Sequence, residues 1–190
     1  IEVQAFMGAY RHRLCPFVNS FRSRITEDKA FLAILSDEAF AHLLTAEERE
    51  LLSRVLPWTR RLEERRTRKA GADVDLVPYV LANRESLVLK PAHEYGGREV
   101  IVGSEASWPE WDAAVRGAVG GPWVVQERVS PPEELFPVFE AGELRVVPLK
   151  VNHGPFSVAG APAGAVARAS SKPVVNVSVG GASVPTFVVG

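Results

Sequence analysis

The stretch that decides the fold is "SLVLKPAHEYGGREVIVG", residues 86–103. Its first apolar run ends in Lys90 and a proline, the chain then passes through Gly96 and Gly97, and a second apolar run follows at once. This pattern predicts a strand, a flexible turn and a second strand. A lysine is costly to bury unpaired, so the Lys90 ammonium must reach solvent, a carboxylate or a bound anion.

The two glycines extend this prediction toward phosphate binding. Gly96 and Gly97 can adopt positive φ angles and let backbone N–H groups approach a phosphate closely. Glycine pairs also form ordinary hairpins, so both interpretations stay open at this point. The chain has no G-x-x-x-x-G-K-[ST] loop and no G-x-G-x-x-G after a strand. A phosphate here would therefore lie beneath a β-turn and not at the start of a helix.

The composition excludes several classes of protein. With 46% hydrophobic and 24% charged residues in 190, the chain resembles a globular domain and not a disordered one. No apolar run reaches the roughly 20 residues of a membrane helix, and a net charge of −1 gives no general attraction to nucleic acid. Cys15 is the only cysteine, which excludes an intramolecular disulfide and predicts a cytoplasmic location.

Helical patterns dominate the first part of the chain. Residues 26–44 carry apolar positions three and four apart, and Thr45 with Glu48 forms a capping-box pattern before the next apolar run. The arginine-rich residues 59–73 predict a third helix that ends at Gly71. Interleaved glutamates favour an ion-paired, solvated face for this segment over a nucleic-acid-binding arm.

Short apolar runs separated by turn residues follow and predict strands, among them residues 98–103, 173–179 and 184–189. One further helix follows Ser107, where Glu110 completes a second capping box. The layout predicts an α+β fold in two parts. Residues 1–83 form a helical part, which begins at Ile1 without an initiator methionine and which we expect to be truncated. Residues 84–190 form a mainly antiparallel sheet with one inserted helix.

A second group of polar residues stands at the end of a predicted strand. In "PWVVQERV", Gln126 and Glu127 follow the apolar residues, and their amide and carboxylate could bind an adenine edge and a ribose. A solvent-facing strand end is the alternative. The order of lysine strand, glycine turn, helix and "VVQE" strand is more specific than any one of its parts.

These segments together resemble a known family. "LVLKPAHEYGGREVIVG", then "WVVQERV" and "GAPAGAVARAS", are similar to the C-terminal part of circularly permuted ATP-grasp proteins related to glutathionylspermidine synthase. The upstream "VNSFRSRITEDKAFLAILSD" is similar to the segment before the nucleotide site of that family. The resemblance runs from about Asn19 to the end of the chain and implies an ATP-grasp-like, nucleotide-binding part at residues 84–190.

The resemblance also implies a set of ATP-binding residues, with ATP held between two β-layers. Lys90 would bind the α- and β-phosphates beneath a lid formed by Gly96 and Gly97. Lys29 matches an earlier phosphate-contacting lysine, although it could equally be an exposed helix residue. The adenine and ribose would face the residues that end and follow the "WVV" strand, which are Gln126, Glu127, Arg128 and Val129.

The activity implied is that of an ATP-dependent carboxylate–amine ligase, which phosphorylates a small-molecule or peptide carboxylate before an amine attacks it. Catalysis of phosphoryl transfer consists mainly of positioning and of cations around the transferred group. Arg168, in "VARAS", is similar to an arginine in the closing segment of the family and would clamp the acyl phosphate or the acceptor. A rim salt bridge is its alternative role, and Arg60 is a weaker candidate of the same kind.

The implied Mg²⁺ has few visible ligands. Magnesium requires oxygen donors, typically one or two carboxylates together with phosphates. Only Asn19 could match a metal ligand of the family, and Glu2 is the one acid before it. The ligands therefore lie upstream of this chain or have been lost. The second possibility predicts a non-catalytic binding or interaction module with the same fold.

Overall fold

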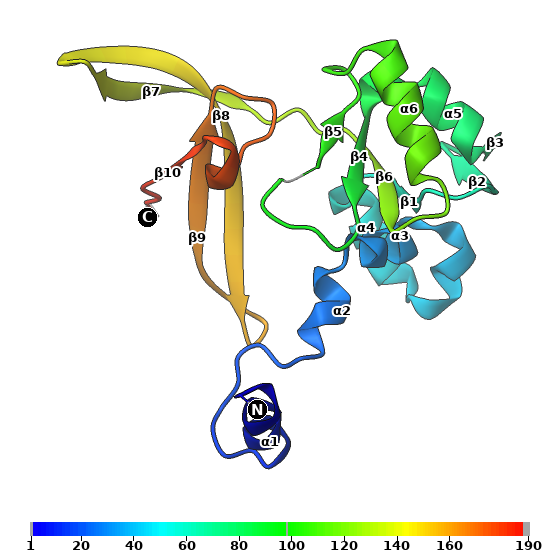
Figure 1. The fold of residues 1–190 in the computed structure, drawn as a ribbon, viewed down its shortest axis with the longest axis horizontal. Coiled ribbons are helices and arrows are strands. Elements are labelled where there is room, and N and C mark those ends of the chain that lie inside the picture. The colour runs from blue at the N-terminus through cyan, green and yellow to red at the C-terminus, as the bar shows by residue number, and fades with distance from the viewer. Residues whose placement is uncertain (1, 98, 188–190) are drawn as a thin grey trace.

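The computed structural model describes residues 2–97 and 99–187 (Figure 1). It contains helices and antiparallel sheets, which confirms the α+β class. Arg98, at the start of one predicted strand, and Val188 and Val189, at the end of another, lie outside the described residues. No helix within the described ranges is both long enough and apolar enough to span a membrane.

The predicted continuous helix over residues 26–44 is wrong. The chain forms α2, α3 and a 3-10 helix η1 there, with breaks at Asp28 and Asp37. Both aspartates have extended backbones, and their carboxylates accept hydrogen bonds from Ala30 N (2.8 Å) and Ala39 N (3.1 Å). Aspartate is a favoured N-cap, so each one starts a new element in the middle of the apolar pattern. The helical elements of this region are α1 (Glu2–Arg11), α2 (Ser23–Glu27), α3 (Lys29–Ser36), η1 (Glu38–Leu43) and α4 (Ala46–Val55).

The capping box predicted at Thr45 is confirmed. Glu48 N donates to Thr45 Oγ1 at 3.2 Å, and Thr45 N donates to Glu48 Oε2 at 2.8 Å. These reciprocal bonds satisfy two backbone donors at the start of α4.

The arginine-rich helix predicted over residues 59–73 is wrong. The segment forms β1 (Thr59–Arg61) and a hairpin of β2 (Arg66–Lys69) and β3 (Ala72–Asp75). Ala70 and Gly71 form the two-residue turn with φ angles of 50° and 84°, as a type I′ turn requires. Charges of opposite sign face each other across the hairpin, at Arg66–Asp75 (3.6 Å) and Arg68–Asp73 (3.9 Å). Cross-strand pairs therefore replace the helical pairs expected from the sequence.

The first sheet has the strand order β1-β6-β4-β5, and each of its strand pairs is antiparallel. Its later strands are β4 (Leu87–Pro91), β5 (Ile101–Val102) and β6 (Trp123–Glu127). The short helix η2 (Arg84–Ser86) precedes β4, while α5 (Leu76–Ala82) and α6 (Trp108–Ala118) lie beside each other against the sheet (Figure 1). The capping box predicted at Ser107 is present in α6.

The core of this part lies between the first sheet and the helices α5 and α6. Trp111 is fully buried, and its indole Nε1 donates to Val80 O at 3.1 Å. The other buried members of this core are Leu62, Leu76, Val77, Val80, Leu87, Leu89, Val115, Ala118 and Val125. Because side chains alternate along a strand, Lys90 and Gln126 must project from the opposite face of the sheet.

The second sheet stands apart from the first in Figure 1, and residues 128–132 connect the two. Its strands are β7 (Glu133–Glu140), β8 (Glu143–Val158), β9 (Ala161–Ser170) and β10 (Ala182–Val184), in the order β10-β9-β8-β7. The strand predicted over residues 173–179 is wrong, because a 3-10 helix, η3 (Val177–Val179), occupies its end. The Asn176 side chain starts η3 by accepting from Ser178 N.

The boundary between residues 83 and 84 stays a prediction. β1 precedes that boundary and β6 follows it, and the two strands pair with each other, with Thr59 opposite Gln126. The first sheet therefore contains residues from both sides of the predicted division.

Candidate functional site

A pocket of about 330 Å³ lies on the face of the first sheet that is turned away from α5 and α6. Its walls come from α3, from β4 to β6, from the loops after β4 and β6, and from the segment after β9. Eight of the residues predicted to bind the nucleotide line it, namely Lys29, Lys90, Gly96, Gly97, Gln126, Glu127, Arg128 and Val129. Segments as far apart in the sequence as Lys29 and Val174 thus meet at one concave surface.

Lys90 is half-buried in this pocket. Its Nζ donates to Gln126 Oε1 at 2.6 Å. Burial lowers the pKa of Lys90, and the neighbouring cation of Lys29 lowers it further. Two amines that repel each other in a partly desolvated pocket would both be stabilised by a bound polyanion.

Lys29 joins the start of α3 to the loop after β4. Its backbone N donates to Ala92 O at 3.0 Å, and its Nζ donates to Pro91 O at 3.1 Å and to Glu94 O. Burial lowers the pKa of Lys29, whereas Asp28 and Glu94 raise it. The Lys29 side chain therefore lies at the pocket, and its hydrogen bonds hold the residues just before the glycine turn in place.

The glycine turn has the backbone predicted for it. Gly96 and Gly97 have φ angles of 75° and 77°, which side chains other than hydrogen rarely permit. The hydroxyl of Ser178, in η3, donates to Gly96 O. A Cβ added at Gly96 would lie 3.0 Å from that hydroxyl oxygen, and the positive φ angle already disfavours any other residue at this position.

Gln126 does not have the free amide that adenine recognition would need. It is only 8% exposed, its Oε1 accepts from Lys90, and its Nε2 donates to Thr59 Oγ1 at 2.8 Å. Both ends of the amide are therefore occupied within the protein. The structure favours a supporting role for Gln126 over the predicted contact with the base.

The residues after Gln126 are anchored to neighbouring segments. The Glu127 carboxylate pairs with Lys69 Nζ at 2.9 Å and stays 43% exposed. Arg128 Nη1 donates to Ser104 Oγ at 2.6 Å, and its Nη2 lies 3.9 Å from Glu105. Val129 is 67% exposed at the start of the link to the second sheet.

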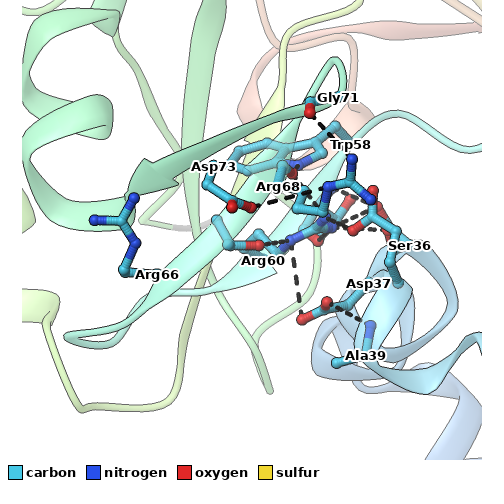
Figure 2. Close-up of polar contacts among 12 residues, drawn as sticks. Ser36, Asp37, Ala39, Trp58, Arg60, Arg66, Arg68, Gly71 and Asp73 are labelled. Atoms are coloured by element: carbon cyan, nitrogen blue, oxygen red, sulfur yellow. Dashed lines mark hydrogen bonds and ion pairs between the residues drawn. The ribbon is translucent and has the colours of Figure 1, made fainter.

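Arg60 is fully buried and does not line the pocket. Figure 2 shows the polar contacts around it. Its Nε donates to Thr67 Oγ1 at 2.6 Å, and its Nη2 donates to Glu38 Oε2 at 2.8 Å and to Arg68 O at 3.1 Å. Nη1 donates to the backbone and hydroxyl oxygens of Ser36. All three nitrogens are engaged, so the geometry gives Arg60 a structural role and not that of a substrate clamp.

Arg168 and Asn19 are not among the residues that line the pocket. Arg168 is half-buried on β9, between Asn152 on β8 and Ser183 on β10. Asn19 is exposed in the segment between α1 and α2. In residues 2–97 and 99–187 there is no group of three or more His, Cys, Asp or Glu side chains that could hold a metal ion. Asn19 as a magnesium ligand stays a prediction.

The pocket also contains residues that the sequence analysis did not single out. Tyr95 is 75% exposed beside the glycine turn, and Pro173 and Val174 contribute a wall from the far end of the chain. Val88, Val100 and Val102 add apolar surface. The alternation of β4 could have identified Val88, because it precedes Lys90 by two residues on the same face.

A comparison with models of known protein families gives no match for this chain. A comparison with curated proteins gives no match either. The function is therefore argued from the geometry of the pocket.

Proposed function

We propose that the pocket binds ATP, with Lys90 and Lys29 at the polyphosphate. The observation that carries this proposal is the convergence of the two lysines, the glycine turn and the residues after β6 on one concave surface. A volume of about 330 Å³ lies in the usual range of small-molecule sites, about 300–1,000 Å³. An ammonium group gives charge-assisted hydrogen bonds to phosphate, which are stronger than neutral ones.

Within this proposal the base lies toward the link between the two sheets. Val129 and the exposed part of Glu127 are at the pocket, as are the apolar side chains of Val88 and Val102. Backbone groups and apolar surface can hold a purine ring, and Glu127 can accept hydrogen bonds from the ribose. Gly96 and Gly97 lie over the phosphates.

We further propose that this ATP site serves an ATP-dependent carboxylate–amine ligase, as the resemblance to permuted ATP-grasp proteins implies. The carboxylate and the amine would be small molecules or peptides. Two features support this proposal. The pocket lies on an antiparallel sheet, and Pro173 and Val174, which follow β9 of the second sheet, form one of its walls. The cations at the pocket would offset charge on the phosphoryl group.

The alternative is a binding or interaction module that holds nucleotide without turnover. It is favoured by one observation, since the described residues offer no cluster of metal-binding side chains and Asn19 lies outside the pocket. Any Mg²⁺ would then arrive with the nucleotide and be held by its phosphates and water.

A phosphate-release assay on the full-length protein separates these two functions. The protein is incubated with Mg-ATP and a panel of amines and carboxylates, including peptides with a free carboxylate. Phosphate release that requires both an amine and a carboxylate is expected for a ligase. ATP binding without such release supports the non-catalytic module.

As the pH rises, the affinity for ATP should fall at a lower pH than it would if the lysines of the site had the pKa of a lysine in water. The pKa of Lys90 is lowered by burial and by Lys29. Because ATP prefers the ammonium form, affinity is retained below this lowered pKa and is lost as pH rises through it. The other charged groups that line the pocket are Lys29, Glu94, Glu127 and Arg128.

Calorimetric titrations of ATP between pH 7 and 10.5 measure this loss. The phosphates stay fully ionised in that range, because their second pKa lies near 6. We expect the affinity to begin falling below about pH 10.4, the value for a lysine in water. An affinity that stays constant up to that pH contradicts a role for Lys90 as a partly buried cation in the site.

A further inference from the structure

We propose that Gln126 and Thr59 are positioning residues that hold the Lys90 ammonium in place for a bound phosphate. The inference deepens the proposed function and rests on it for the identity of the ligand. Neither residue needs to touch the nucleotide, since Thr59 is fully buried and Gln126 is 8% exposed.

The register of the first sheet places the three side chains in one row. Thr59 on β1 is directly opposite Gln126 on β6. Gln126 is in turn opposite Val88 on β4, and Lys90 follows two residues later on the same face. Diagonal neighbours of this kind are within reach of long side chains. The row crosses three adjacent strands and ends in the pocket.

The hydrogen bonds determine which end of the Gln126 amide faces Lys90. The Thr59 hydroxyl donates its single proton to Pro57 O at 2.8 Å, so toward Gln126 it can only accept. Gln126 Nε2 therefore faces Thr59, and Oε1 faces Lys90 Nζ. If the amide were flipped, its Nε2 donor would face the Lys90 ammonium, which is also a donor. Its Oε1 acceptor would face the Thr59 oxygen, which can only accept. The hydroxyl of Thr59 thus determines which end of the amide meets the lysine.

Thr59 is itself fixed by the buried arginine network. Its backbone N donates to Ser36 Oγ at 2.9 Å, and Arg60 Nη1 donates to Thr59 O at 2.9 Å. These bonds join β1 to the end of α3. In the described residues no buried side-chain polar atom lacks a partner. Lys90 is therefore oriented by a rigid part of the fold and not by the loop beside it.

The variant Thr59→Val removes the hydroxyl with little change of shape, and Thr59→Ser retains it. Two measurements are made on each: ATP affinity by calorimetry, and the pH dependence of trace acetylation of Lys90 followed by peptide mass spectrometry. We expect Thr59→Val to weaken ATP binding about 10-fold, the effect of losing about one oriented hydrogen bond. The acetylation midpoint should move about 1 pH unit lower, because Gln126 Oε1, which stabilises the ammonium form, is no longer held against Lys90.

Further variants separate positioning from a general effect on folding. Thr59→Ser should restore both values, and Gln126→Glu should move the acetylation midpoint upward, because it places a carboxylate beside Lys90. In a Lys90→Ala background, Thr59→Val should weaken ATP binding no further. The proposal is wrong if Thr59→Val lowers the ATP affinity as much in the Lys90→Ala protein as in the unmodified one. It is also wrong if the Thr59→Val protein folds and keeps both the ATP affinity and the acetylation midpoint unchanged.

Two other outcomes are also decisive. Should Thr59→Val not fold, Gln126→Met removes the Oε1 acceptor of Lys90 itself and is judged by the same criteria. Should the unmodified protein bind no ATP, the proposed function fails, while a lowered acetylation midpoint in Thr59→Val still supports the positioning of Lys90.

Discussion

Replacing Lys90 with alanine should weaken ATP binding about 30- to 150-fold, or ~2–3 kcal/mol, the contribution of a charge-assisted hydrogen bond in a partly buried site. The side chain lies in the pocket, and its ammonium is half-buried between Gln126 and the neighbouring Lys29. Isothermal titration of the unmodified and altered proteins with Mg-ATP measures the difference.

Lys150→Ala is the matched control for this experiment. Lys150 is also a half-buried strand lysine, but it lies on β8 and does not line the pocket. We expect its replacement to change the affinity less than about two-fold, as for a site with no contact to the ligand. An equal loss of affinity in the two variants, or no loss in either, would mean that Lys90 does not contribute to nucleotide binding.

Replacing Arg60 with methionine should lower the free energy of unfolding by about 3–5 kcal/mol, as is typical when one partner of a buried ion pair is removed. Arg60 is fully buried and joins Ser36 and Glu38 to Thr67 on β2. Its loss leaves the acceptors of Ser36 and Thr67 without their donor and removes a cation 3.9 Å from the buried Asp37 carboxylate. Since small domains have only about 5–15 kcal/mol in total, the variant should lose a large fraction of its stability.

Arg61→Met is the control for Arg60. Arg61 follows directly on the same strand, but its side chain is 55% exposed and its nearest carboxylate, on Glu63, is 3.9 Å away. We expect a change of at most about 0.5 kcal/mol in urea denaturation, as is usual for surface positions. Comparable destabilisation by the two substitutions would contradict the central structural role assigned to Arg60.

The composition of the pocket could be predicted from the sequence to a large extent. Lys90 at the end of an apolar run, the glycine pair and the polar residues after "WVV" are local signals, and β4 and β6 are adjacent strands of one sheet. Antiparallel pairing of these strands brings their polar residues to one face. The contribution of Pro173 and Val174 could not be predicted, because it depends on how the chain returns after β9.

The hairpin at residues 66–75 could not be predicted, because the charges of this segment are also spaced as in a helix and Ala70–Gly71 is an uncommon turn dipeptide. Ala70–Gly71 is a two-residue turn with positive φ at both positions. The same dipeptide turns the chain at Ala141–Gly142 and at Ala159–Gly160, again with positive φ angles. An alanine in such a turn is unusual, so the glycine alone was interpreted as the end of a helix.

The roles of Arg60 and Gln126 required three-dimensional information. Arg60 follows a turn in an arginine-rich stretch, and nothing in that stretch indicates that this arginine is the buried one, at the junction of α3, η1 and β2. For Gln126 the deciding facts are the register with Thr59 and the bond from the Thr59 hydroxyl to Pro57 O. Neither can be predicted from the order of residues.

Photolabelling with 8-azido-ATP tests most directly whether the pocket beside Lys90 is a nucleotide site. The labelled protein is digested and the modified peptide is identified by mass spectrometry, with and without an excess of ATP. We predict an ATP-protected adduct within residues 123–129, where β6 and the residues after it line the pocket. Labelling that ATP does not prevent, or protected labelling confined to distant segments such as residues 2–22 or 141–160, would contradict the account.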